Sequence, residues 1–146
     1  MSRPVAVICT LVAGVLAAIQ PSVNASLAGH VGDLGAAFVS LVFASLIIGV
    51  LLVVLGETGR LSGIGSIEPE HAIGGIGGAT IVVVSLVAAR PLGVGALIAL
   101  LVAAQVVVSV IADRYGWFGA HQIGISAGRI VGVVLVIAGT VLVTRT

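Results

Sequence analysis

Two groups of polar side chains interrupt the apolar stretches of this chain. In the first group, Gln20 and Asn24 lie four residues apart, with Pro21 beside Gln20, after the apolar run 5–19. On a helix this spacing puts both amides on one face, and the proline removes a backbone donor and kinks the helix. An amide both donates and accepts hydrogen bonds, and it is costly to leave unpaired in an apolar environment. We expect both amides to face other helices or a wet cavity, either as packing contacts or as a binding site.

The second group follows the same spacing further along the chain. Gln105, Ser109 and Asp113 are each four residues after the last, so one helix face carries an amide, a hydroxyl and a carboxylate. Gln105 is predicted to lie about 20 Å along the span from Leu92, past its midplane, and Asp113 at the far interface beside Arg114. Ionisable groups are tolerated at helix ends. We therefore expect Asp113 to be solvated or to form an interface ion pair with Arg114, with direct contact to a ligand as the alternative.

Composition predicts an all-α integral membrane protein. Hydrophobic residues make up 60% of the 146 residues, charged residues 8%, and the mean hydropathy is +1.36, whereas a soluble domain carries roughly 25% charge. A formal charge of +1 gives no indication of nucleic-acid binding. The single cysteine, Cys9, excludes a disulfide within the chain. No nucleophile, phosphate-binding or metal-ligand motif is found, so we expect neither an enzyme nor a cofactor.

The order of apolar runs predicts five membrane-spanning helices in one transmembrane domain, residues 1–146. The spans are expected at about 5–28, 34–55, 72–89, 92–112 and 129–143. Residues 30–33 form a tight connection, 56–71 a polar loop and 90–93 a short hinge that makes the third and fourth spans an antiparallel hairpin. Ser40 is one of the small residues that allow close helix approach in the second span. Tyr115, Trp117 and Phe118 are typical of a membrane interface.

The distribution of arginine gives only a weak orientation signal. Five spans put the termini on opposite sides, so Arg3, Arg60, Arg114 and Arg129 lie on one side and Arg90 and Arg145 on the other. Orientation follows such residues in short loops, and four against two is compatible with insertion both ways. A bundle of this size cannot enclose a pathway alone, and a dimer would supply the missing wall. No acidic residue lies in the middle of a span, which argues against a proton relay through a buried carboxylate.

Several short motifs accompany these polar residues: Leu27-Ala28-Gly29, Ala89-Arg90-Pro91-Leu92-Gly93-Val94 and Tyr115-Gly116. Together with Gln20, Asn24, Gln105, Ser109 and Asp113 they resemble, over the whole chain, the YdcZ-like inner-membrane family of the drug/metabolite transporter superfamily. That family is described as exporters that occur as single five-span proteins, as gene pairs and as fused halves of inverted topology. The resemblance implies a multi-pass protein of the bacterial inner membrane that forms an antiparallel homodimer, or a heterodimer with an oppositely oriented homologue.

The chain is also distantly similar to the small multidrug resistance proteins, which have four spans and a glutamate in the first. No acid lies in the first span here, so proton-driven export of cations by that mechanism is not implied. We expect a small-molecule exporter that works by alternating access, with Gln20, Asn24, Gln105 and Ser109 lining its cavity. The alternatives are a small dual-topology passive channel lined by the same amides, and a non-transporting membrane subunit that stabilises a partner.

Overall fold

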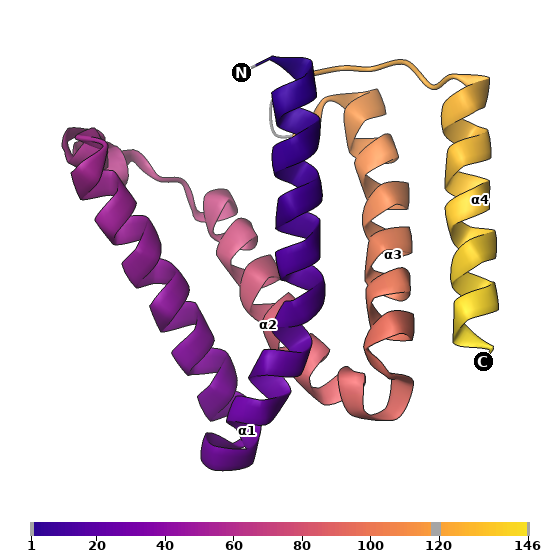
Figure 1. The fold of residues 1–146 in the computed structure, drawn as a ribbon. Helices are drawn as coiled ribbons and strands as arrows, with labels where there is room; N and C mark the ends of the chain where they lie inside the picture. The colour runs from indigo at the N-terminus through magenta and orange to yellow at the C-terminus, as the bar shows by residue number, and fades with distance from the viewer. Residues whose placement is uncertain (1, 118–120, 146) are drawn as a thin grey trace. The chain divides into compact units, whose positions relative to one another are not determined.

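The computed structural model describes residues 2–117 and 121–145, and every secondary-structure element in these ranges is helical (Figure 1). The elements, in chain order, are α1 (Arg3–Val54), the 3₁₀ helices η1 (Glu57–Ser66) and η2 (Pro69–His71), α2 (Ala72–Leu92), α3 (Val94–Tyr115) and α4 (Ala127–Thr144). The predicted all-α class is confirmed. The chain divides into two compact units, residues 1–89 and 90–146, which are described separately below. The prediction of one transmembrane domain stays a prediction.

Helix α1 contains two membrane-length segments joined at Gly32. Its 52 residues would make a straight helix of about 78 Å, more than twice the ~30 Å hydrocarbon thickness of a bilayer. Gly32 interrupts it with φ 75° and ψ 167°, a conformation that is essentially restricted to glycine. The first limb (residues 3–31) and the second limb (residues 33–54) therefore correspond to the first two predicted spans, and the tight connection at 30–33 is confirmed.

Pro21 does not end the first limb. It is buried inside α1, and within that helix only Gly32 has non-helical backbone angles. A proline interrupts one hydrogen bond of a helix without reversing the chain, whereas a glycine with positive φ can reverse it. The predicted kink at Pro21 stays a prediction, and the sharp change of direction lies at Gly32.

The core of the first unit is small and is made mainly of alanine. Ala28 of the first limb, Ala36 and Ala37 of the second limb and Leu86 of α2 form one buried cluster. Small side chains let helix backbones approach closely, which is how helices pack when lipid offers no hydrophobic driving force. This cluster holds the two limbs together close to their junction.

The polar segment between α1 and α2 forms short 3₁₀ turns rather than an open loop. Ser62 and Ser66 each donate a hydrogen bond to the carbonyl three residues earlier, and Glu57 pairs with Arg60 at 2.9 Å. At η2, the Glu68 amide donates to Nδ1 of His71 and the Glu68 side chain accepts from the His71 backbone. The segment predicted as a polar loop therefore consists largely of 3₁₀ helix.

In the second unit, α3 and α4 lie side by side and run antiparallel (Figure 1). Thr140 near the end of α4 donates to the carbonyl of Ala99 near the start of α3, at 3.1 Å. At the opposite end, Arg129 of α4 contacts Asp113 of α3. These two links fix the register of the hairpin, because each joins the start of one helix to the end of the other.

The predicted hinge at residues 90–93 is shorter in the structure. Helix α2 continues through Arg90 and Pro91 to Leu92, and only Gly93 separates it from α3. Gly93 has φ 75° and ψ 153°, so it is the residue that breaks the helix. Pro91 is tolerated because neighbouring groups re-satisfy the backbone around prolines in membrane helices. The predicted antiparallel arrangement of the third and fourth spans stays a prediction.

The helices have the surfaces of membrane spans. Within residues 2–117 and 121–145, four helices are long and apolar enough to cross a bilayer, and α1 divides at Gly32 into two limbs. Large apolar side chains are exposed on all four, among them Leu16 at 65%, Val54 at 72%, Val87 at 52%, Val108 at 54% and Leu135 at 66%. Tyr115 and Trp117 stack with ring centroids 6.5 Å apart, as suits an interface. Phe118, predicted to join them, lies outside the described residues.

Candidate functional site

Asn24 is the most buried amide of the predicted site. It is 5% exposed, and its Oδ1 accepts a hydrogen bond of 2.5 Å from the hydroxyl of Ser40. Asn24 lies on the first limb and Ser40 on the second, so the bond joins the two limbs about 12 Å from their junction at Gly32. The hydrocarbon of a bilayer offers no hydrogen-bond partner, so the bond between Asn24 and Ser40 gives the amide oxygen a partner that water would otherwise supply.

Gln20 is one turn before Asn24 but has a different environment. Its side chain is exposed and makes no hydrogen bond with the described residues. The two amides share a side of the helix, as predicted, but only Asn24 reaches the second limb. Gln20 is therefore available to a ligand or to a second protein surface.

Gln105 and Ser109 lie together on an open face of α3. With Ala104 and Val108 they line a shallow pocket of about 490 Å³. The Ser109 hydroxyl donates to the carbonyl of Val106, while the amide of Gln105 makes no hydrogen bond with the described residues. Gln105 is about 16 Å from the start of α3 and about 15 Å from its end. Its amide thus lies at the middle of the span rather than beyond it.

Asp113 forms an ion pair with Arg129, not with Arg114 as predicted. Oδ2 of Asp113 lies 2.7 Å from Nη2 of Arg129, and the two side chains are 30% and 29% exposed. Neighbouring residues on a helix point about 100° apart, so Arg114 cannot easily reach Asp113. The Asp113 backbone also accepts a hydrogen bond from Ile123. Asp113 therefore closes the end of the α3–α4 hairpin, which is a structural role.

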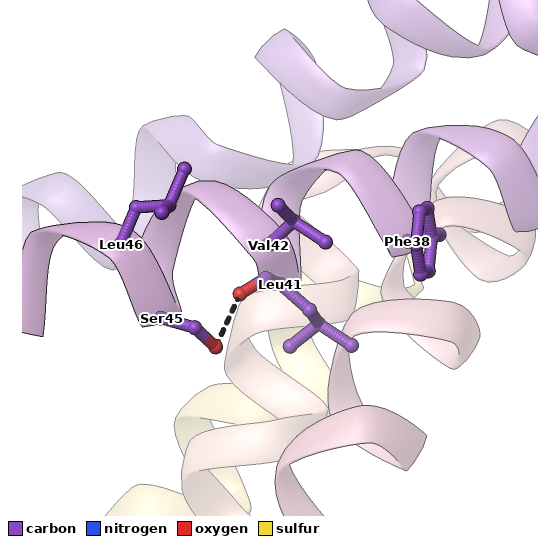
Figure 2. A pocket seen from close by; sticks show the side chains of 5 residues that line it. All are labelled: Phe38, Leu41, Val42, Ser45 and Leu46. Atoms are coloured by element: carbon purple, nitrogen blue, oxygen red, sulfur yellow. Dashed lines mark hydrogen bonds between the residues drawn. The ribbon is translucent and has the colours of Figure 1, made fainter. Parts of the chain in front are cut away.

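A separate surface on the second limb of α1 is apolar. Phe38, Leu41, Val42, Ser45 and Leu46 line a shallow pocket of about 310 Å³ (Figure 2). Figure 2 shows the only hydroxyl in this group, that of Ser45, turned to the carbonyl of Leu41 at 2.8 Å. Because its polar group is satisfied within the helix, this surface suits lipid or an apolar protein face better than a polar solute.

Of the four predicted site residues, Gln105 and Ser109 share a pocket in the second unit. In the first unit, Asn24 bonds to Ser40, and Gln20 is exposed one turn before Asn24. A cavity common to all four stays a prediction. Among the described residues, no three His, Cys, Asp or Glu side chains lie close enough to hold a metal ion.

Sequence reasoning missed four side chains that the structure places at helix contacts. Ser40 was predicted only to allow close helix packing. Arg129 was predicted to lie at the start of the last span, with no contact to Asp113. Ser85 and Thr140, both 7% exposed, received no role. The available signal was the same for all of them: a polar side chain inside or at the end of an apolar run, where an unpaired group is costly.

The long apolar helices, with large apolar side chains exposed along them, define a multi-pass helical membrane protein. The family described as "Putative inner membrane exporter, YdcZ" matches residues 5–142. The chain belongs to this family, and it is a multi-pass protein of the bacterial inner membrane. Membership of an exporter family suggests a transporter. No curated protein and no solved structure gave a significant match.

Proposed function

We propose that this chain is one half of a small-molecule exporter, and that two copies in opposite orientations form the transport unit. Membership of an inner-membrane exporter family supports transport as the activity. The exposed amides on α1 and α3 support a polar pathway, because each can offer hydrogen bonds to a solute at the surface of an otherwise apolar span. Alternating access would carry the solute from one side to the other.

The observation that carries this proposal is the position of Gln105. Its amide is exposed at the middle of α3 and has no hydrogen-bond partner among the described residues. Facing lipid at that depth, it would cost several kcal/mol, roughly. In a cavity that contains water or solute, the Gln105 amide forms hydrogen bonds and this cost disappears.

The antiparallel dimer is supported by the weak orientation signal and by the size of the chain. The arginines are divided four against two between the predicted sides, which favours neither orientation strongly. Transporters built from two inverted halves place their substrate site near the midplane, between the halves. The depth of Gln105 fits such a site.

In this proposal the solute meets Gln20, Asn24, Gln105 and Ser109. Amides and hydroxyls bind polar solutes through donors and acceptors without requiring a charge. In the membrane-length helices of the described ranges, the acidic residues are Asp33, beside the break at Gly32, and Asp113, near the end of α3. The spans therefore offer no central carboxylate to a cation. Hydrogen bonding would therefore dominate recognition.

Counterflow in proteoliposomes tests this function. The solute is chosen as one to which overproduction of the chain gives cells tolerance. Vesicles that hold the purified chain and an excess of unlabelled solute should transiently accumulate the labelled solute, with an initial rate that saturates. Protein-free vesicles are the control. A flux that rises linearly with concentration and shows no counterflow would indicate a passive channel and contradict the proposal.

A further inference from the structure

The geometry points to Ser40 as a positioning residue that fixes the amide of Asn24, so that its two N–H donors serve a solute carrying a carbonyl or carboxylate oxygen. This inference rests on the proposed function, in which Asn24 lines the transport pathway. It adds a residue to the site and assigns the solute a chemistry: hydrogen-bond acceptors, not cationic donors.

The orientation of the Asn24 amide follows from its contact with Ser40. The two atoms are 2.5 Å apart, a distance within the range of O–H···O bonds and shorter than the roughly 2.7–3.2 Å of bonds that involve an N–H. The atom of Asn24 that faces Ser40 is therefore the carbonyl oxygen, and the Ser40 hydroxyl donates. The NH₂ group then points away from this contact.

The NH₂ group of Asn24 has no partner within the described chain. The residue is 5% exposed, and Nδ2 makes no hydrogen bond with any described residue. Nδ2 keeps some exposure, because among the described residues Nη1 of Arg129 is the only fully buried side-chain nitrogen or oxygen without a hydrogen bond. An acceptor on a bound solute can pair with the two donors of Nδ2, whereas an ammonium group, which has only donors, cannot.

The surroundings of Asn24 also fit an acceptor-bearing solute. The buried cluster of the first unit begins one helical turn after Asn24, at Ala28, and includes Ala36 and Ala37, none of which has a side-chain polar group. No acidic residue lies on the first limb of α1, so nothing on that limb would neutralise a cation beside Asn24. The contact also spans the two limbs. Binding at Asn24 would thus be sensitive to how the limbs meet.

One isotope-labelled residue is enough to test the inference. Asn24 is the only asparagine of the chain, so the full chain labelled with ¹⁵N-asparagine in micelles gives a single side-chain amide signal pair. Three probes are titrated at constant ionic strength: acetate, acetamide and methylammonium. We expect acetate and acetamide to shift the signal with saturation and methylammonium to leave it unchanged. Acetate alone would restrict the solute to carboxylates, and acetamide alone to neutral carbonyl compounds.

Substitution of Ser40 separates positioning from packing. Ser40→Ala should raise the apparent dissociation constant of the acceptor probe about fivefold, as expected from the loss of one neutral hydrogen bond, and Ser40→Thr should restore it. Ser45→Ala is the matched control, because the Ser45 hydroxyl bonds only to its own helix. A Ser40→Ala variant that is less stable but binds the probe normally would show packing alone and overturn the assignment.

The remaining outcomes are also decisive. A signal that responds to methylammonium, or to none of the three probes, overturns the inference. Counterflow is measured separately. If counterflow is normal and no probe shifts the Asn24 signal, the inference about Ser40 and Asn24 fails, and the exporter proposal stands. A normal acetate response without any counterflow would count against the exporter and leave the role of Ser40 standing.

Discussion

Replacing Gln20 and Gln105 together by leucine is expected to lower the transport rate about 30-fold or more. Each amide offers the solute at least one hydrogen bond, and two such bonds of about 1 kcal/mol each correspond to that factor. Both side chains are exposed and neither bonds to the described residues. The substitution therefore removes contacts with solute without removing contacts within the chain.

Folding should survive this double substitution. Leucine is favourable in a membrane span, and no intramolecular hydrogen bond is lost. Counterflow rates, thermal unfolding and yield are compared for the wild type, the double variant and Gln122→Leu. Gln122 is the third glutamine and lies outside the helices, so its replacement should leave transport unchanged. A well-folded double variant with wild-type transport would contradict the assignment of Gln20 and Gln105.

Removing either partner of the Asp113–Arg129 ion pair is expected to destabilise the chain by about 2–4 kcal/mol. The pair is mostly buried, with a 2.7 Å contact, and truncation leaves the other charge without its partner in a poorly solvated place. Nη1 of Arg129 is already buried without a hydrogen bond to the described residues. Asp113 therefore supplies the main compensation for the guanidinium charge of Arg129. Asp113→Ala should lower the free energy of unfolding more than Arg129→Ala does.

A double-mutant cycle measures this contribution. The midpoints of thermal unfolding are compared for Asp113→Ala, Arg129→Ala and the double variant, which should be less damaged than the sum of the two single changes. Glu57→Ala is the control, because its pair with Arg60 is largely exposed and should contribute about 0–1 kcal/mol. Additive losses for Asp113 and Arg129 would show that the ion pair does not stabilise the hairpin.

The spans could be predicted from the sequence because hydrocarbon selects for length and apolarity alone. The run before Pro21, the valine-rich run in α2 and the stretch after Gly128 each required a helix of about 20 residues. The breaks were harder to assign. Pro21, Gly32, Pro91 and Gly93 are all local helix-breaking signals, yet only the two glycines interrupt the helices. Positive φ depends on the path of the whole chain, which local composition does not reveal.

The candidate site was predictable in its residue types and not in its contacts. Polar side chains in apolar runs identified Asn24 and Gln105, since such groups are expensive and rarely kept without a reason. The partner of Asn24 could not be found, because Ser40 is sixteen residues away on the second limb. Arg129 was missed for the same reason, being sixteen residues from Asp113 across a loop. Sequence spacing orders residues on one helix but does not say which two helices meet.

Two oppositely inserted copies are proposed to form the transport unit, and cysteine accessibility in intact cells reports their orientations. Gly65 lies in the polar segment and has open space where a side chain would be added. Gly65→Cys is made on a Cys9→Ser background, and intact cells are treated with a thiol reagent that does not cross the membrane. We expect labelling of about half the molecules, which would show both orientations. Labelling of all molecules or of none would show one fixed orientation and contradict an antiparallel homodimer.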